Sequence, residues 1–413
     1  MTYNYNSSDL VHPVELTERE EFLLKESRTF CIYPWTHLHV YPTGEAYPCC
    51  HAEMHVGRVG NCKEKTMAEI WRDEPMQRLR ADMLAERENI ACSRCYEKEK
   101  SGFFSGRRSA NKHHGHHIKK LDANPFELVY WDVRFSNLCN LRCRSCGHVF
   151  SSQWYQDQTK LAGPKWAAEN SVLNYAGRTE TDMWEQLIPH LDYVEQIYFA
   201  GGEPLLMEEH YNILEELIRR GRTNVRLIYN TNFTHTDLKG RSVFEYWNQF
   251  DSVSIGASLD AEGARAEYIR KGTRWDDVVA NRRAMIDQCP NVDFYISCTL
   301  SIMNAAHVAD LHRSWVEQGL IKIQDFNINI LLSPFWYRID IAPAHYKDYI
   351  ESLWDDHIAW ISDQDRLRRA TEGFEAAKRF LRAHDNSRLL IDFWSRTRRL
   401  DDLRGESVFA VLP

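Results

Sequence analysis

The 413-residue sequence contains no apolar run long enough to cross a lipid bilayer, and it has no excess of basic residues. Its first residues, MTYNYNSSDL, provide neither the basic nor the apolar segment that a secretory signal uses. The formal net charge of −8 gives no general attraction to nucleic acid or to an anionic membrane. The sequence also lacks internal repeats. We therefore expect a cytoplasmic protein with no membrane partner, and nucleic acid is not an expected partner.

Cysteine, in contrast, is plentiful. The chain has eleven, at positions 31, 49, 50, 62, 92, 95, 139, 143, 146, 289 and 298. In a secreted protein this number predicts disulfides, whereas closely spaced thiols in a reducing compartment indicate metal binding. With 43% hydrophobic residues, the chain is long enough for one barrel-sized domain and a smaller one.

The pattern of apolar residues changes along the chain. Residues 1–105 are loop-rich, with one helical stretch, TMAEIWRDEPMQRLRADML, and a basic, histidine-rich linker follows at 106–125. From 126 to 340, helical patterns alternate with apolar runs at 127–135, 194–200, 225–231, 252–258, 293–300 and 324–332. This alternation predicts an α/β fold with a parallel sheet, either a partial barrel or an open doubly wound sheet, with chemistry at the carboxyl ends of its strands. Residues 341–413 are predicted to form a helical C-terminal extension.

Three cysteines occur on one short loop directly after the first of these apolar runs. The run FELVYWDVRF is followed by CNLRCRSC, which holds Cys139, Cys143 and Cys146. Thiolates at these spacings can converge on one metal or cluster, for which cysteine is a preferred ligand. Three protein ligands leave one coordination position open, whereas a structural site uses four. A zinc loop, or three thiols with no shared role, is the alternative interpretation.

This loop resembles the Cys-x3-Cys-x2-Cys signature of the radical S-adenosylmethionine (radical SAM) superfamily, which follows the first strand of a partial (β/α)6 TIM-like barrel. The resemblance implies a [4Fe–4S] cluster held by Cys139, Cys143 and Cys146, with S-adenosylmethionine (SAM) bound to the fourth iron. It also implies reductive cleavage of SAM to a 5′-deoxyadenosyl radical that abstracts hydrogen from the substrate. The family often has an aromatic residue just before the last cysteine or its neighbour, whereas this loop has Arg144 and Ser145.

Residues at the ends of later strands match the SAM contacts of this family. The resemblance assigns that role to Gly201, Gly202, Glu203, Asn232, Ser258, Asp260 and Arg270. In the GGEP element the glycines allow close backbone approach, and the Glu203 carboxylate suits the SAM amino group. The Arg270 guanidinium suits the SAM carboxylate. Asn304 is the nearest substitute for a glycine-rich adenine contact that is absent here. The alternative for each single position is a capped turn or a surface charge.

A second set of thiols lies in the N-terminal segment. Cys31, Cys49, Cys92 and Cys95 could close a cluster with four ligands, and Cys50 is the alternative to Cys49. Their spacing resembles the SPASM/twitch module of radical SAM enzymes in its one-cluster form, which implies an auxiliary [4Fe–4S] cluster. In familiar members this module follows the barrel, whereas here it precedes it. A structural zinc ribbon is the alternative. The remaining cysteines are predicted to be buried small hydrophobic residues, namely Cys62, Cys289 and Cys298.

The resemblance implies a radical SAM oxidoreductase that receives electrons from a donor such as flavodoxin or ferredoxin. We expect oxidative modification of a peptide or protein side chain. The alternatives are dehydrogenation or epimerisation of a carbohydrate-like small molecule, nucleotide or RNA modification, and a zinc-stabilised binding module without catalysis. The sequence HHGHH in the linker either binds metal or is solvated, and we favour the solvated linker. No residue is predicted as the acid, base or hydrogen donor.

Overall fold

The computed structural model describes residues 10–100 and 104–411 of the chain. The chain divides into two compact units, and each draws on distant parts of the sequence. Unit 1 comprises Met1–Ser136, Asn174–Gly201 and Arg219–Arg226, and unit 2 comprises Asn137–Leu173, Gly202–Ile218 and Leu227–Pro413. These units do not follow the domain boundaries expected at 105, 125 and 340, so those boundaries stay a prediction.

Unit 1 is built on a mixed sheet in the order β5-β4-β1-β2-β3. Its strands are β1 (His37–Val40), β2 (Glu45–Tyr47), β3 (Gly60–Asn61), β4 (Tyr130–Val133) and β5 (Gln196–Phe199). β4 pairs in parallel with both β1 and β5, whereas β2 is antiparallel to β1 and β3. The α-helices of this unit are α1 (Glu18–Glu21), α2 (Met67–Arg72), α3 (Glu74–Leu84), α4 (Ser93–Lys100), α5 (Gly106–His114) and α8 (Asp182–Leu187).

Strand β1 was not predicted, because its sequence HLHV lies in a stretch that reads as a polar loop. All four of its residues are buried. The two histidines are accommodated by β4: His37 Nδ1 lies 2.9 Å from the Tyr130 carbonyl oxygen, and His39 Nδ1 lies 2.9 Å from Asp132 Oδ2. A strand buried on both faces lacks the alternation that identifies a half-exposed strand. The N-terminal segment therefore supplies a strand that lies beside β4.

The single helix predicted over TMAEIWRDEPMQRLRADML is wrong, since the structure has two helices there. Asp73 is extended, ends α2 and caps α3 by accepting a hydrogen bond from Glu74 N at 3.1 Å. Pro75 lacks the N–H that would continue the helical ladder to the Trp71 carbonyl. That carbonyl instead accepts a hydrogen bond from Arg80 Nη1 at 2.7 Å, so the break costs no buried hydrogen bond.

Unit 2 is an α/β structure with parallel strands in the order β6-β9-β10-β11. These strands are β6 (Arg226–Thr231), β9 (Val253–Ala257), β10 (Asp293–Leu300) and β11 (Phe326–Ile330), and β7 (Asp237–Leu238) with β8 (Arg241–Ser242) forms a short antiparallel pair. Its α-helices up to β11 are α6 (Trp154–Ala162), α7 (Pro164–Glu169), α9 (Glu208–Arg219), α10 (Val243–Trp247), α11 (Gly263–Ile269), α12 (Trp275–Gln288) and α13 (Val308–Glu317).

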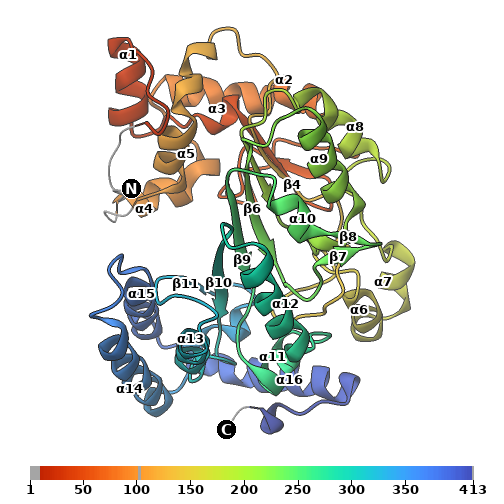
Figure 1. Cartoon of the computed structure of the whole chain (residues 1–413), viewed down its shortest axis with the longest axis vertical. Coiled ribbons are helices and arrows are strands. Elements are labelled where there is room, and N and C mark those ends of the chain that lie inside the picture. The colour runs from red at the N-terminus through yellow and green to blue at the C-terminus, as the bar shows by residue number, and fades with distance from the viewer. Residues whose placement is uncertain (1–9, 101–103, 412–413) are drawn as a thin grey trace. The chain divides into compact units, whose positions relative to one another are not determined.

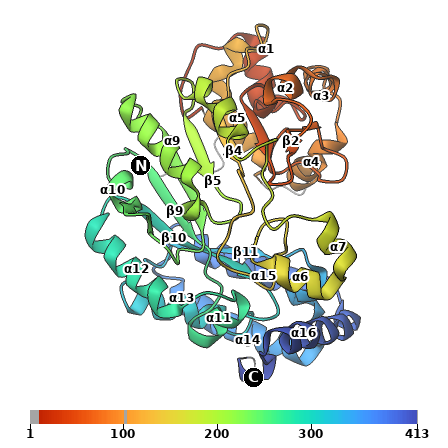
Figure 2. The same ribbon diagram turned by 90° about the vertical axis from the view of Figure 1, so that its right-hand side faces the viewer.

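The C-terminal part of unit 2 is helical, as predicted. It contains α14 (Ala344–Ile361), α15 (Arg369–Ala383) and α16 (Leu390–Arg404), and α15 packs against β11 and α14 (Figures 1 and 2). The six predicted apolar runs correspond to β4, β5, β6, β9, β10 and β11. The α/β class with parallel strands and the helical C-terminal extension are therefore confirmed, and the barrel curvature stays a prediction.

The interpretation of the histidine-rich segment as a solvated linker is wrong. Residues 106–120 form α5 and the 3-10 helix η4 (Gly115–Lys120), and Arg107, Asn111 and His114 are buried. The basic side chains are compatible with burial because acidic partners come from elsewhere in unit 1, such as Glu99 for Arg107. Those partners are not visible in the local sequence.

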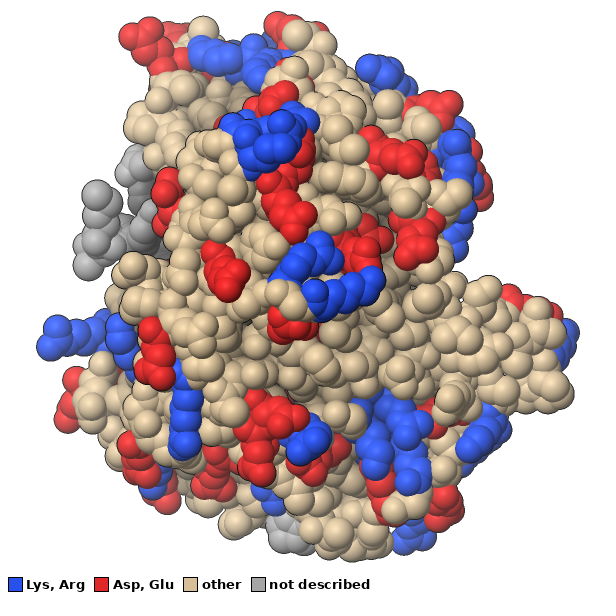
Figure 3. All heavy atoms as spheres, turned by 45° about the vertical axis from the view of Figure 1, so that its right-hand side comes forward, with Lys and Arg blue, Asp and Glu red and all other residues tan. Residues whose placement is uncertain are grey.

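None of the helices in the described ranges combines the length and the apolar character that crossing a bilayer requires. The molecular face drawn in Figure 3 carries acidic and basic side chains interspersed. This agrees with the modest net charge of −8 for the whole chain.

Candidate functional site

The three cysteines of the loop after β4 come together in unit 2. Cys139 and Cys143 are 8% and 9% exposed, and they form one buried cluster with Leu141, against which Cys146 packs. The structure thus brings together three thiols that a Cys-x3-Cys-x2-Cys spacing allows to share one site. Their assignment as metal ligands stays a prediction.

The backbone of this loop is fixed by side chains at the start of the following helical segment. Ser152 Oγ donates to the Cys139 carbonyl oxygen and accepts from Cys139 N, both at 3.3 Å. Trp154, the first residue of α6, donates from Nε1 to the Cys143 carbonyl oxygen at 2.9 Å. The thiols are therefore held in place by the protein itself, which is what a preorganised cluster site requires.

The electrostatics of the loop fit a cationic centre. Burial raises the pKa of the Cys146 thiol to about 12, with a further contribution from the neighbouring Cys143. Burial also raises the pKa values of Cys139 and Cys143, and the Arg270 guanidinium, with Nη1 3.8 Å from Cys143 Sγ, partly opposes the rise for Cys143. Three neighbouring thiols, two of them buried and one half-buried, become thiolates together only when a metal compensates their charge. The loop therefore fits an iron–sulfur cluster.

Arg144 anchors the same loop, a role that no local sequence pattern indicates. Its side chain is fully buried, and Nη2 lies 2.5 Å from both Asp401 Oδ1 and Glu406 Oε2. Its guanidinium also lies 3.7 Å from the centre of the Tyr268 ring. The resembled family often has an aromatic residue near this position, whereas this chain has Arg144 between Cys143 and Cys146. The Arg144 side chain joins the loop to the C-terminal segment around α16.

The GGEP turn approaches the cysteine loop closely. Gly201 has a φ of +94°, and a Cβ on Gly202 would lie 2.1 Å from the Leu138 carbonyl oxygen, so both positions require glycine. Glu203 N donates to that same Leu138 oxygen at 2.7 Å. The turn and the cysteine loop are therefore joined by backbone contacts.

The Glu203 carboxylate is buried at the end of β6. Its Oε1 accepts from Thr231 Oγ1 at 2.7 Å, and its Oε2 accepts from Asn232 N at 2.7 Å. Burial raises the pKa of Glu203 to about 7, although the hydrogen bonds from Asn232 and Thr231 lower it. Asn232 in turn donates from Nδ2 to Asn140 Oδ1 at 2.9 Å. This network links the end of β6 to the cysteine loop.

Asp260 and Arg270 form a bidentate ion pair beside Cys143. Arg270 Nε lies 2.8 Å from Asp260 Oδ2, and Arg270 Nη2 lies 3.0 Å from Asp260 Oδ1. Thr299 N donates to Asp260 Oδ1 at 2.8 Å. A cavity in unit 2 begins at this carboxylate, and its lining comprises Arg144, Ser145, Asp260, Ile269, Thr299, Ser301, Met303, Leu331 and Tyr337. The cavity thus borders the cysteine loop, through Arg144 and Ser145, as well as Asp260.

Two further positions were singled out in the sequence. Ser258 lies at the end of β9, half-buried, with its N–H donating to the Thr231 carbonyl oxygen at 2.7 Å. Asn304 is fully buried, and its Nδ2 donates to the Asp260 carbonyl oxygen at 2.8 Å while its Oδ1 accepts from Ser301 N at 2.7 Å. The amide of Asn304 therefore shapes the loop after β10, and the expected adenine contact stays a prediction.

The N-terminal cysteines form a second group of thiols, in unit 1. Burial raises the pKa of Cys49 well above its ordinary value, and the nearby thiols of Cys50, Cys92, Cys31 and Cys95 raise it further. The pKa of Cys31 is raised in the same way by burial and then by Cys92 and Cys95. Two buried thiols, Cys31 and Cys95, and two half-buried thiols, Cys49 and Cys92, influence one another electrostatically, which suits a metal centre with four cysteine ligands.

The structure distinguishes Cys49 from Cys50. The pKa of Cys50 is raised to about 12 by burial and then by the Asp132 carboxylate, while Arg134 opposes the rise. Cys49 is influenced by Cys31 and by both cysteines of the CSRC sequence, whereas Cys95 alone among these influences Cys50. The electrostatic surroundings of Cys50 thus include Asp132 and Arg134, and the choice between Cys49 and Cys50 as the fourth ligand stays a prediction.

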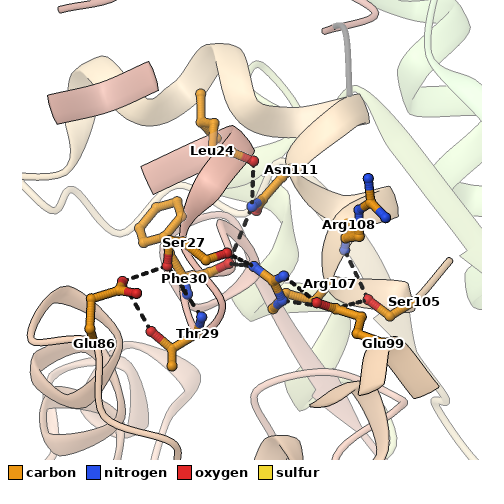
Figure 4. Close-up of polar contacts among 10 residues, drawn as sticks. All are labelled: Leu24, Ser27, Thr29, Phe30, Glu86, Glu99, Ser105, Arg107, Arg108 and Asn111. Atoms are coloured by element: carbon orange, nitrogen blue, oxygen red, sulfur yellow. Dashed lines mark hydrogen bonds and ion pairs between the residues drawn. The ribbon is translucent and has the colours of Figure 1, made fainter. Parts of the chain in front are cut away.

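The segment that carries Cys31 is held by helix α5 (Figure 4). Arg107 Nη1 donates to the carbonyl oxygens of Ser27 and Phe30 at 3.0 and 2.7 Å, and Arg107 is paired with Glu99. Asn111 accepts from Ile32 N at 2.9 Å and donates from Nδ2 to the Phe30 oxygen at 3.2 Å. The backbone on both sides of Cys31 is therefore fixed by two side chains from the histidine-rich segment.

The remaining cysteines outside these groups are buried, as predicted. Cys62, Cys289 and Cys298 are 0%, 2% and 0% exposed. Cys298 Sγ accepts a hydrogen bond from Asn304 Nδ2 at 3.6 Å. These thiols pack as small hydrophobic side chains.

Comparison with known proteins gives a match in the N-terminal segment. Residues 31–96 match the model of the SPASM family, an iron–sulfur cluster-binding domain. The matched range contains all four candidate ligands of the second thiol group. The prediction of a SPASM-like module is confirmed, and the match favours iron over the alternative of a zinc ribbon.

Two curated proteins resemble a larger part of the chain. The cysteine-type anaerobic sulfatase-maturating enzyme of Clostridium perfringens strain 13 is 26% identical over 239 residues, which are 55% of this chain and 59% of that protein. The enzyme of the same name from another strain of Clostridium perfringens is 27% identical over 168 residues, 38% of this chain and 44% of that protein. The chain thus spans between 44% and 59% of the length of these relatives.

Solved structures were compared as well. The anaerobic sulfatase-maturating enzyme anSMEcpe with bound AdoMet has a TM-score of 0.40 and 20% identity, and the match covers 56% of this chain and 61% of that chain. Streptococcus suis SuiB bound to S-adenosylmethionine has a TM-score of 0.34 and 14% identity, with 66% of this chain and 59% of that chain covered.

Proposed function

We propose that this chain, which is similar to radical SAM enzymes with a SPASM-like iron–sulfur module, is itself such an enzyme and oxidatively modifies a peptide or protein side chain. One observation carries the proposal: the thiols of Cys139, Cys143 and Cys146 pack together on a loop that is joined by backbone hydrogen bonds to the GGEP turn. The sequence order of these features is that of the resembled family.

Within this proposal, the thiolates of Cys139, Cys143 and Cys146 would hold a [4Fe–4S] cluster. When bound, this cluster would supply the electron for reductive cleavage of SAM. The protein's part is to bind and orient. Gly202 allows the ligand-binding turn to lie against the cysteine loop, and Glu203 offers a buried carboxylate to a cationic amino group.

Asp260 and Arg270 have a second part in the proposal. Arg270 is fixed by Asp260 and points Nη1 at Cys143, so its guanidinium is oriented for an anionic group next to the cluster. The adjoining cavity has a mixed lining, in which Ile269, Met303 and Leu331 supply the apolar part.

The four thiols of unit 1 would hold an auxiliary [4Fe–4S] cluster that accepts or passes on an electron. Such a cluster suits an oxidation, in which the substrate loses an electron after hydrogen abstraction. The external electron donor would be a flavodoxin or a ferredoxin. A peptide substrate is favoured over a carbohydrate because the relatives are named as enzymes that mature sulfatases, and one solved structure of anSMEcpe is described with a bound peptide.

The activity is tested with anaerobically reconstituted protein, SAM and dithionite. We expect formation of 5′-deoxyadenosine and methionine, and about eight irons per chain for two four-iron clusters. Cys143→Ala should abolish cleavage of SAM, whereas the control Cys289→Ala, which removes a buried thiol outside both groups, should retain it. Reconstituted protein that holds its iron but never cleaves SAM would contradict the proposal.

The substrate class is tested separately by mass spectrometry. Peptides and sugars are incubated with enzyme, SAM and reductant, and the products are searched for the loss of two hydrogens. A mass change confined to sugars would overturn the peptide assignment without affecting the radical SAM activity.

A further inference from the structure

Three histidines, His114, His116 and His117, converge on one carboxylate in unit 1. His116 Nε2 and His117 Nε2 lie 3.1 and 3.0 Å from Glu195 Oε1. One ligand atom from each of His116, His117 and Glu195 lies within 4.8 Å of the others. His116 and His117 belong to η4, and His114 is the last residue of α5. Glu195 directly precedes β5, so it lies 79 and 78 residues from His116 and His117 in sequence.

A third histidine, His114, faces the same carboxylate. His114 Nδ1 lies 3.9 Å from Glu195 Oε2, beyond hydrogen-bond distance. Within the part of the chain that the structure describes, this buried nitrogen has no hydrogen-bond partner. Buried polar atoms are nearly always satisfied, so an orphaned imidazole nitrogen beside two other imidazoles and a carboxylate indicates a missing partner.

We propose that His116, His117 and Glu195 bind one Zn²⁺ or a similar divalent first-row ion, with His114 beside the site. Zinc binds histidine nitrogen and carboxylate oxygen at about 2.0–2.2 Å, which separates tetrahedral ligand atoms by about 3.3 Å. The observed separations of 3.1 and 3.0 Å between Glu195 Oε1 and the two imidazole nitrogens are close to that value. Neutral imidazole and carboxylate are a ligand set that zinc accepts, whereas thiolate is absent from this group.

The proposed ion has a structural role. It would fasten η4, and with it helix α5, to the start of β5. Through Arg107 and Asn111, α5 holds the backbone on both sides of Cys31 (Figure 4). The ion would therefore stabilise the thiol group of the SPASM-like module indirectly, by fixing the helix that holds the backbone around Cys31. This inference does not rest on the proposed radical SAM activity.

The test uses the full-length protein, reconstituted anaerobically with iron and sulfide so that the cysteines are occupied, and then titrated with Co²⁺. We expect one Co²⁺ per chain, with visible d–d absorption, without thiolate-to-cobalt charge transfer, and displaced by Zn²⁺. His116→Ala and His117→Ala should each weaken Co²⁺ binding by at least about 100-fold. The matched control is His113→Ala, whose Nδ1 already bonds to the Ser109 carbonyl oxygen at 2.9 Å.

A second measurement distinguishes the loss of metal binding from poor folding of a variant. Zn²⁺ should raise the melting temperature of the unsubstituted protein and of His113→Ala, because an ion that binds only the folded state stabilises it. His117→Asn, which keeps a polar side chain, should fold and lose this increase. No saturable Co²⁺ binding, binding unchanged in His116→Ala and His117→Ala, or charge-transfer bands that assign the ion to cysteine would each overturn the proposal.

Discussion

Replacing Arg144 tests whether the loop of three cysteines depends on a buried charged anchor. Arg144→Met keeps most of the side-chain volume and removes the charge. It leaves Asp401 and Glu406, whose side chains are 7% and 10% exposed, without their shared cation. A charge-assisted hydrogen bond contributes about 1.5–3 kcal/mol, so the loss of two gives about 3–6 kcal/mol.

The remaining partners of both carboxylates reduce this cost. Asp401 still accepts hydrogen bonds from Tyr268 Oη at 2.9 Å and from Val408 N at 2.7 Å. Glu406 keeps Lys271, whose Nζ lies 2.8 Å away. We therefore expect the lower part of the range, about 3 kcal/mol, in agreement with the usual cost of removing one member of a buried ion pair.

The assay is urea unfolding of the cluster-free protein, followed by tryptophan fluorescence. At an m-value of about 3 kcal/mol/M, the midpoint of Arg144→Met should fall by about 1 M. Arg274→Met is the control, because that side chain is 81% exposed and its Nε lies 3.4 Å from Asp277, a surface pair worth less than about 1 kcal/mol.

Two results would refute the reasoning. One is a midpoint for Arg144→Met that falls no further than that of Arg274→Met. The other comes from a background in which the carboxylates are neutral, Asp401→Asn with Glu406→Gln. There the effect of Arg144→Met should shrink well below 3 kcal/mol, and an undiminished effect would assign the loss to packing.

Three further predictions concern the GGEP turn and the N-terminal thiol group. Gly202→Ala should lower the iron content measured by iron analysis by about half. The added Cβ would clash with the Leu138 oxygen and disturb the loop of three cysteines, whereas the SPASM-like module would keep its iron. In cluster-free protein the folded state binds the Glu203 proton more tightly than the unfolded state, because burial raises the pKa of Glu203. The free energy of unfolding should therefore fall by up to about 3 kcal/mol as the pH rises from about 4.5 to about 7. The urea midpoints of Glu203→Gln should lack this pH dependence, and an equal dependence would disprove the assignment. Cys49→Ala should lose the auxiliary iron and Cys50→Ala should keep it, and the reverse outcome would exchange the two assignments.

The sequence by itself determined the features that depend on local spacing. The loop with Cys139, Cys143 and Cys146, the GGEP turn and the six apolar strands could all be read from neighbouring residues. Glycine at 202 was expected because only glycine allows close approach, and the structure shows the carbonyl oxygen that approaches it. These predictions succeeded because pattern and conformation are set within a few residues.

Only the tertiary structure decided the features that depend on residues far apart in the chain. Arg144 finds its acidic partner 257 residues away, and the histidines of the supposed linker find Glu195 nearly 80 residues away. Strand β1 was hidden because its histidines are satisfied by β4 rather than by solvent. Charged and polar side chains are predicted to be exposed to solvent unless a buried hydrogen-bond or ion-pair partner is known. For residues far apart in the chain, that partner is evident only from the fold.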